Sequence, residues 1–353
     1  MATATTQTFD GVDKALLTEV QKQFPIDHRP FQILSEKLGI SEQACLERIT
    51  RLKANQVIRQ ISAIFDTRAI GYQSTLVAMK KADPARVDEA AEVINQHPGV
   101  SHNYKRNDPF NIWFTVAVPP GDSLEQVVRI LHALAKADET IILPTLRLYK
   151  IGVKLDLTGQ ESALESPEEI YDEKRRMTVK PPLSEQDIRF IRILQEDLPL
   201  LEMPFVVWAE QAETAEEELF AWARKMEHLG YMRRFAAILH HRNAGFKANA
   251  MVVWQVPEDQ VDTVGEQMAL FREVSHCYRR PVYPSWPYPL FTMIHAETYS
   301  ACMDVVKRIE DRVGQFPHKS LFSTKEYKKT RVKYFTPALD QWWRDIGSQV
   351  ILK

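Results

Sequence analysis

The sequence VSHNYKR at residues 100–106 returns, with two changes, as VSHCYRR at residues 274–280. The two copies lie 174 positions apart (276 − 102), and sliding the chain against itself by that offset keeps residues matched without a gap from residue 13 to residue 106. Self-similarity at a fixed offset indicates an internal duplication. The chain is therefore expected to fold as two copies of one module, joined head to tail.

Both copies of this stretch keep an imidazole, a phenol and a guanidinium. These side chains are His102, Tyr104 and Arg106 in the first copy, and His276, Tyr278 and Arg280 in the second. A fold rarely needs such titratable and charged groups merely to pack. We interpret them as a ligand site; the alternative is a polar strand end that was repeated because the whole unit was duplicated.

The composition is that of a globular protein without a membrane span. Of the 353 residues, 44% are hydrophobic and 26% are charged, no run approaches the roughly 18 apolar residues of a span, and the start lacks a signal peptide's apolar region. We expect a cytoplasmic protein with no membrane partner. The cysteines Cys45, Cys277 and Cys302 form no Cys-x-x-Cys pair, so neither a disulfide framework nor a metal cluster is predicted.

Each copy begins with a pattern typical of a helix-turn-helix. In the first copy, helices are predicted at residues 13–20 and 31–38 and then after the N-cap Ser41, followed by a β-rich wing at residues 57–65. In the second copy, the helices are predicted at residues 187–194, 205–210 and 215–229, with Gly230 as C-cap and the wing at residues 232–240.

The rest of each copy has the β-α-β-β-α-β order of a ferredoxin-like domain. The first copy has strands predicted at residues 72–79, 100–105, 112–118 and 143–157, with helices at 84–96 and 124–137. The second has strands at 248–256, 274–280, 290–296 and 320–334, with helices at 261–270 and 298–313. Phe114 matches Phe291 at an offset of 177, which predicts three added residues in the second copy's loop.

The predicted fold class is α+β, a tandem repeat of a winged helix-turn-helix and a βαββαβ domain. The predicted domains are helix-turn-helix domains at residues 11–65 and 183–240, ferredoxin-like domains at 66–158 and 241–337, a linker at 159–182 and a tail at 338–353 with a short helix around Trp342 and Trp343.

DNA binding is not expected, because recognition helices carry a basic, polar surface. The candidate recognition helix of the second copy begins with Glu216, Glu217 and Glu218, and it carries Phe220 and Trp222, which are better suited to packing. The first copy's helix has mixed charge. A net charge of −2 and a pI near 6.6 add no attraction to phosphate.

The residues around the motif suit a planar ligand with several carboxylates. In a pair of ferredoxin-like domains related by a two-fold axis, the two sheets face each other. Side chains on the strands of both copies are therefore expected to meet in one site. Arginine suits carboxylates, and Trp and Tyr offer flat faces for a ring. The candidate ligand-binding residues are Arg106, Arg233, His240, His241, Arg242, Arg279, Arg280, Trp286, Tyr288, Lys329 and Arg331. Alternatively, a single His is structural and the Trp-Pro-Tyr-Pro segment only shapes a loop.

The chain resembles a known family through these motifs. Its domain plan looks like that of Lrp/AsnC regulators, but HCYRRP at residues 276–281 and WPYPLFTMIH at residues 286–295 resemble siroheme decarboxylases. The resemblance covers nearly the whole chain, and it is to both related subunits fused into one intramolecular pseudo-dimer; further dimerisation stays open. It implies removal of the C12 and C18 acetate carboxyl groups of siroheme, giving 12,18-didecarboxysiroheme for heme d1 or heme.

The resemblance also suggests residue roles. His276 is the first candidate for a proton donor or an axial ligand to the substrate's iron, with Tyr278 in support and Arg280 anchoring a carboxylate. No cofactor is expected beyond the iron that siroheme carries. His102 and Tyr104 are candidates for a second working site, although the loop difference and His240 and His241 favour the second copy. The alternatives are an Lrp-type ligand-sensing regulator and a tetrapyrrole carrier without catalysis.

Overall fold

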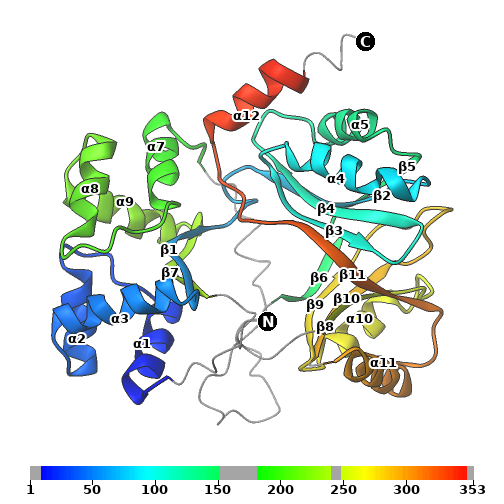
Figure 1. Ribbon diagram of the computed structural model, residues 1–353, viewed down its shortest axis with the longest axis horizontal. Coiled ribbons are helices and arrows are strands. Elements are labelled where there is room, and N and C mark those ends of the chain that lie inside the picture. The colour runs from blue at the N-terminus through cyan, green and yellow to red at the C-terminus, as the bar shows by residue number, and fades with distance from the viewer. Residues whose placement is uncertain (1–8, 152–180, 240–247, 297, 348–353) are drawn as a thin grey trace. The chain divides into compact units, whose positions relative to one another are not determined.

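The computed structural model describes residues 9–151, 181–239, 248–296 and 298–347 (Figure 1). These residues form two compact units. Unit 1 holds residues 9–70 and 181–239, and unit 2 holds residues 71–151, 248–296 and 298–347. Each unit therefore gathers the corresponding parts of both copies. The predicted linker falls almost entirely outside the described residues, as do His240, His241 and Arg242.

Unit 1 contains both helix-turn-helix segments. Its helices are α1 (Gly11–Lys22), α2 (Pro30–Leu38), α3 (Glu42–Ala54), α7 (Glu185–Leu194), α8 (Pro204–Ala212) and α9 (Glu216–His228). Ser41 caps α3 as predicted, since its side chain accepts from the Ala44 N–H. Helix α9 ends one residue earlier than predicted: Leu229 is its C-cap, and Gly230 follows with φ 73°.

The wing of each copy in unit 1 is a single strand. Strand β1 (Ile58–Phe65) pairs antiparallel with β7 (Met232–Leu239), and Ala63 lies opposite Phe235. The main-chain groups of each strand thus find partners in the other copy, as buried N–H and C=O groups must. Around this pair, Phe24, Phe31 and Phe205 are fully buried. The two copies are therefore joined by pairing of the strands that follow the third helix of each copy.

Unit 2 contains both ferredoxin-like segments and the tail. The first copy supplies β2 (Gln73–Lys80), η1 (Pro84–Arg86), α4 (Val87–Asn95), β3 (Val100–Arg106), β4 (Phe110–Val118), α5 (Leu124–Ala135), β5 (Glu139–Leu143) and β6 (Arg147–Ile151). The second supplies β8 (Ala248–Trp254), α10 (Val261–Ala269), β9 (Val274–Arg279), β10 (Leu290–Ala296), α11 (Tyr299–Val313) and β11 (His318–Lys329). The tail forms α12 (Pro337–Trp342) and then a short π-helix at Trp343–Gly347. The short helix predicted there is confirmed.

The strands of unit 2 form one nine-stranded sheet in the order β5-β2-β4-β3-β11-β8-β10-β9-β6. One strand was predicted over residues 143–157; there β5 ends at Leu143, β6 takes residues 147–151, and residues 152–157 lie outside the described residues. Strand β5 pairs with β2 of its own copy, whereas β6 pairs with β9 of the other copy. Pro144, which has no N–H to donate, follows β5 and ends that ladder.

Strand β11 also joins the two copies. Its first residues, 318–322, pair with β8, and residues 323–329 continue along β3 of the first copy. Helices α4 and α5 cover the outer face of the first copy's strands, and α10 and α11 cover that of the second (Figure 1). A third apolar cluster joins both copies on the inner face and includes Trp113, Leu143, Trp286 and Leu321.

The loop before β10 is longer than the alignment predicted. Trp113 lies opposite Tyr104, and Phe291 lies opposite Tyr278. The offset is therefore 178 (291 − 113) after the loop and 174 (278 − 104) before it, so four residues were added and not three. Matching Phe114 to Phe291 misled the count because neighbouring aromatic residues align equally well when the strand register is unknown.

Candidate functional site

The motif of the first copy forms a row of side chains along β3. Residues two apart in a strand share a face, which places His102, Tyr104 and Arg106 together. The ring centroids of His102 and Tyr104 lie 6.3 Å apart, and the Arg106 Cζ lies 5.7 Å from the centre of the Tyr104 ring. Asn103 points the other way, where its Nδ2 donates to the carbonyl of Ala91 on α4.

The second copy repeats this row with the same geometry. The rings of His276 and Tyr278 are 6.0 Å apart and nearly parallel, at 27°. The Cζ of Arg280 lies 4.9 Å from the centre of the Tyr278 ring. The structure thus brings together, in each copy, the three residues that the sequence singled out.

The arginine at the end of each row donates a hydrogen bond to a main-chain carbonyl of the other copy. Arg106 Nη1 donates to the carbonyl of Leu321 on β11 at 2.8 Å, and Arg280 Nη1 donates to the carbonyl of Leu143 on β5. Arg106 is 6% exposed, and burial lowers its pKa to about 10. Among the described residues, Arg106 forms no ion pair with a carboxylate. A desolvated guanidinium without a counter-charge is costly, and an anionic ligand would offset that cost.

The two rows differ in what lies beside them. In the register of β3 and β11, Lys329 stands opposite His102 and Glu326 stands opposite Tyr104. In the register of β6 and β9, Ile151 stands opposite His276, and Leu148 stands opposite Tyr278. The first row therefore has charged neighbours where the second has aliphatic residue types.

Arg279 lies on the opposite face of β9 from the motif row. It forms ion pairs with Glu258 and, at 3.5 Å, with Asp262 on α10. Lys105, the matching residue of the first copy, lies 3.6 Å from Asp88 on α4. Consecutive residues of a strand point to opposite faces, so two adjacent arginines do not line one site. The structure brings Arg280, and not Arg279, to His276 and Tyr278.

Trp286 occupies the inner apolar cluster. Its side chain is 0% exposed, and its ring lies 5.2 Å from that of Trp113 and 5.5 Å from that of Phe110. The ring of Tyr288, which is partly exposed, lies 5.1 Å from Trp286. Trp286 therefore packs in this structure, and its contact with a ligand stays a prediction.

Sequence reasoning missed one charged pair at this cluster. Lys319 Nζ lies 2.7 Å from Asp108 Oδ2 and 5.4 Å from the centre of the Trp286 ring. The two charged residues are 211 positions apart, and neither belongs to the repeated motif. No local pattern could have joined them, since β11 brings them together only in the folded sheet.

The other predicted ligand residues are dispersed. Arg233 belongs to unit 1, where its Nη2 lies 3.0 Å from Asp66 Oδ2. Arg331 follows β11 and is partly buried, and its role in binding stays a prediction. In the described part of the chain, no cluster of three His, Cys, Asp or Glu side chains could hold a metal ion. There is also no helix in these ranges that is long and apolar enough to cross a membrane.

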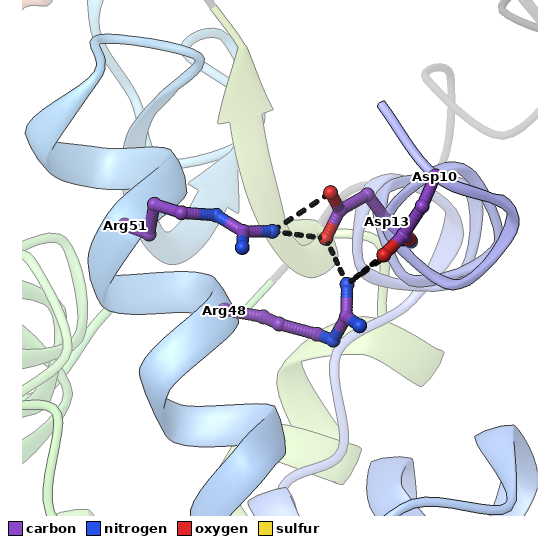
Figure 2. A network of polar contacts seen from close by, with 4 residues as sticks. All are labelled: Asp10, Asp13, Arg48 and Arg51. Atoms are coloured by element: carbon purple, nitrogen blue, oxygen red, sulfur yellow. Dashed lines mark hydrogen bonds and ion pairs between the residues drawn. The ribbon is translucent and has the colours of Figure 1, made fainter. Parts of the chain in front are cut away.

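The first candidate recognition helix, α3, has its cationic groups occupied. Figure 2 shows Arg48 and Arg51 reaching from α3 to Asp13 on α1, at 2.6 Å in both cases, while Arg48 also binds Asp10 at 2.8 Å. Asp13 is buried, so these guanidinium groups hold the two helices together. Both guanidinium groups thus already have carboxylate partners, which compete with the phosphates that a DNA-binding helix contacts.

The second candidate recognition helix, α9, is acidic where it begins. Glu216 binds His28 at 2.9 Å, and Phe220 and Trp222 are buried in unit 1. The packing role predicted for these two aromatic residues is confirmed. Negative charge at the helix start would repel a phosphate backbone.

These folds and the duplicated site define the class of the protein as a tandem of helix-turn-helix and AsnC-like ligand-binding domains. Two family models match it: the AsnC-like ligand binding domain at residues 69–150 and 243–328, and the siroheme decarboxylase NirDL-like HTH domain at residues 13–59 and 187–233. The siroheme decarboxylase of Hydrogenobacter thermophilus is 39% identical over 334 residues, which are 94% of this chain and 98% of that relative. The chain belongs to the siroheme decarboxylase family.

Two further relatives support the reading of the chain as a fusion. The siroheme decarboxylase beta subunit of Methanosarcina barkeri is 41% identical over 151 residues, which are 43% of this chain and 99% of that subunit. The crystal structure of the siroheme decarboxylase NirDL in co-complex with an iron-uroporphyrin III analogue superposes with a TM-score of 0.77 at 34% identity, covering 96% of this chain and 99% of that one. Half of this chain thus corresponds to a whole subunit elsewhere.

Proposed function

We propose that this protein is a siroheme decarboxylase that acts in the cytoplasm. It removes the carboxyl groups from the C12 and C18 acetate side chains of siroheme and gives 12,18-didecarboxysiroheme, for heme d1 or heme biosynthesis. The observation that carries the proposal is the duplicated row of imidazole, phenol and buried guanidinium on β3 and β9. The full-length match to a siroheme decarboxylase supports the same reaction.

Siroheme suits these residues because it is planar and anionic. Its carboxylates supply the negative charge that Arg106, nearly fully buried, lacks among the described residues. The guanidinium groups of Arg106 and Arg280 lie over the rings of Tyr104 and Tyr278, and aromatic rings of this kind suit contact with a macrocycle. Binding through carboxylates that do not react would position the reacting acetate. The iron belongs to the substrate, and no other cofactor is required by this chemistry.

The proposed reaction replaces a carboxylate by a proton. His276, supported by Tyr278, donates a proton to the macrocycle next to the carbon that bears the acetate, which makes the ring an electron sink. The bond between the acetate methylene and its carboxylate breaks, and carbon dioxide leaves. The electron pair passes into the ring, the exocyclic carbon takes up a proton, and the ring returns its own. A methyl group remains, and one proton is consumed per carbon dioxide.

The working site is proposed to be the row of the second copy, with His102 and Tyr104 as a second site or a structural counterpart. The four-residue insertion lies in the loop that follows Arg280, and it sets this row apart. Lys329 stands beside His102 and not beside His276, which gives the first row a cationic group suited to holding a carboxylate.

Separate substitutions His276→Ala and His102→Ala test these roles. Purified protein is incubated with siroheme without oxygen, and the product is followed by mass spectrometry for successive losses of carbon dioxide. We expect His276→Ala to lose at least about 100-fold in rate, in line with loss of a general acid. Full activity of the His276→Ala variant would end the assignment of His276. If both variants lose activity, both rows take part in catalysis.

A regulator or a carrier of tetrapyrroles would behave differently in this assay. A carrier would show the absorbance change of the bound macrocycle without any loss of mass. A regulator would bind DNA, which the occupied arginines of α3 and the acidic start of α9 oppose.

A further inference from the structure

The loop at residues 281–289, which we call the long loop, carries the four-residue insertion of the second copy. The N–H of Arg280 donates to the carbonyl of Pro289 at 2.8 Å and closes the base of this loop. Within the loop, Tyr283 and Trp286 exchange two main-chain hydrogen bonds, of 2.9 Å and 2.8 Å. Because Arg280 ends the second row, the conformation of the long loop and the position of this arginine depend on each other.

The long loop packs against the first copy. The ring of Trp286 lies in the inner apolar cluster beside those of Phe110 and Trp113 on β4. The hydroxyl of Tyr283 donates to a main-chain carbonyl of β5. The corresponding loop of the first copy, residues 107–109, is four residues shorter and contains no aromatic residue. The contacts of the long loop therefore have no counterpart in the first copy.

Lys319 on β11 contacts two aromatic rings of the long loop. Its Nζ lies 5.4 Å from the centre of the Trp286 ring and 5.6 Å from that of the Tyr288 ring. The same Nζ lies 2.7 Å from Oδ2 of Asp108, whose side chain is 5% exposed. An ammonium group is attracted to an aromatic face, and a buried carboxylate requires a cation. One ammonium group therefore joins the short loop of the first copy to the long loop of the second.

The position of Lys319 is charged in only one of the two copies. Leu321 and Leu143 correspond to each other, because the carbonyl of each accepts from the arginine that ends a row. Two residues earlier in each strand, and on the same face, stand Lys319 and Ile141. Ile141 is 3% exposed in the inner apolar cluster, so packing alone does not require a cation at this position. The lysine stands at the one position of the two that contacts both Asp108 and the rings of the long loop.

We infer that Lys319 and Asp108 are positioning residues, which hold the long loop against the first copy and thereby keep Arg280 in place at the end of the second row. Under the proposed function Arg280 anchors a carboxylate of siroheme, so the effect on the substrate rests on that function. The attachment of the loop does not. A displaced guanidinium binds a carboxylate less well. Loss of the pair should therefore raise KM more than it lowers kcat.

Hydrogen–deuterium exchange of the full chain without substrate tests the attachment. Lys319→Met removes the ammonium group and keeps a long side chain. Asp108→Asn removes the negative charge and keeps the oxygen that accepts from the Phe110 N–H. In both variants we expect peptides covering residues 280–289 to exchange about 10-fold faster, because the main-chain bonds of the loop open more often. Lys319→Arg, which can pair with a carboxylate and stack on aromatic rings, should keep the wild-type rate.

The matched control is Lys325→Met on the same strand. Lys325 Nζ lies 2.8 Å from Asp88 Oδ2 and 4.9 Å from the centre of the Tyr327 ring, so it has the same kinds of contact with α4 and β11 instead of the long loop. Its loss should leave the exchange of residues 280–289 unchanged. Unchanged exchange in Lys319→Met and Asp108→Asn would overturn the inference, as would an equal acceleration in the control.

Kinetics with siroheme test the consequence for the substrate. We expect KM to rise about 10-fold in Lys319→Met and in Asp108→Asn with kcat within about 2-fold, and Lys319→Arg to restore KM. If Lys319 bound the substrate itself, Asp108→Asn would free its ammonium group and KM would not rise. That result, or faster exchange of the loop without a change in KM, would overturn the positioning role. A wild-type chain whose loop exchanges as expected but that decarboxylates no siroheme would refute the proposed function and leave the attachment of the long loop standing.

Discussion

His97 shows how one buried side chain can make stability depend on pH. Its ring is 0% exposed, its Nδ1 accepts from the Gly99 N–H at 3.0 Å, and it packs edge-on against Trp342 with centroids 4.4 Å apart. Burial lowers the pKa of His97 from 6.5 to about 3. The residue therefore stays neutral in the folded protein, between the sheet of the first copy and the tail helix α12. The second copy has Phe271 at the matching position.

The substitution His97→Phe should make unfolding less sensitive to acid. Between pH 6.5 and about 3 the unfolded chain binds a proton at His97 that the folded chain does not, so the free energy of unfolding falls as the pH drops below 6.5. The slope is about 1.4 kcal/mol per pH unit, and above pH 6.5 this contribution is constant. Urea unfolding at several pH values down to about 4.5 measures the slope in both proteins. Equal slopes would show that His97 does not contribute.

At the scale of elements, the crossing strands β6 and β11 are tied to the other copy by the same contacts. On β6, Tyr149 donates a hydrogen bond to Asp262 of α10, and Arg147 forms an ion pair with it at 2.7 Å. On β11, Tyr327 and Lys325 bind Asp88 of α4 in the same way. The hydrogen bond from Tyr149 is the largest cause of the lowered pKa of Asp262, with Arg147 acting in the same direction.

Removing this carboxylate should weaken the attachment of β6. We expect Asp262→Ala to lower the free energy of unfolding by about 1 kcal/mol, because partly exposed ion pairs are screened by solvent and a network exceeds one pair. The loss should shrink at high salt. Urea unfolding at low and high salt measures it, with Asp88→Ala as the matched variant of the other copy. A loss that grows with salt would contradict an ionic attachment.

The helices that resemble recognition helices should not bind DNA. On α3, Arg48 and Arg51 are bound to Asp13, and α9 begins with three glutamates. A gel-shift assay on mixed genomic DNA should therefore show no tight, salt-sensitive binding. The variant Asp13→Ala offers a control, because it releases both guanidinium groups and should, if anything, increase binding. Tight binding by the unmodified chain would favour the regulator.

At the scale of the whole molecule, neither copy completes its own sheet. In unit 2, β6 of the first copy extends the second copy's strands, and β11 of the second copy continues along β3 of the first. The edge strands β5 and β6 are joined by only residues 144–146, and the Leu146 N–H donates to the carbonyl of Arg279 at 2.9 Å. The inner apolar cluster takes residues from both copies, so each copy alone would expose it.

A chain cut between residues 151 and 181 should still assemble. Co-expressed halves should purify together in equal amounts, because β1 pairs with β7 and β11 pairs with β3 across the two halves. Either half expressed alone should aggregate or pair with itself, since it leaves apolar surface and strand edges without partners. Affinity purification through a tag on one half, followed by light scattering, decides this. A stable, monomeric half would show that the copies are independent domains.

Local patterns accounted for much of this fold, and the misses have a common physical reason. Ser41 predicted the start of α3, because a cap acts on the N–H groups of the next few residues. The separate strand β5 at residues 139–143 and the crossing of β6 to the other copy were missed, since strand partners are chosen by distant segments. Arg279 was grouped with Arg280 although they occupy opposite faces, and the pairing of Arg279 with Asp262 emerged only from the packing of α10.

The sequence by itself determined the duplication, the order of elements in each copy and the His-Tyr-Arg motif, because each depends on residue identity and short spacing. Only the tertiary structure decided that β6 and β11 cross between copies, that Trp286 packs inside the inner cluster and that Lys319 lies beside Asp108. These features follow from strand register and burial. Register and burial are set by contacts between segments far apart in the chain, which no local pattern encodes.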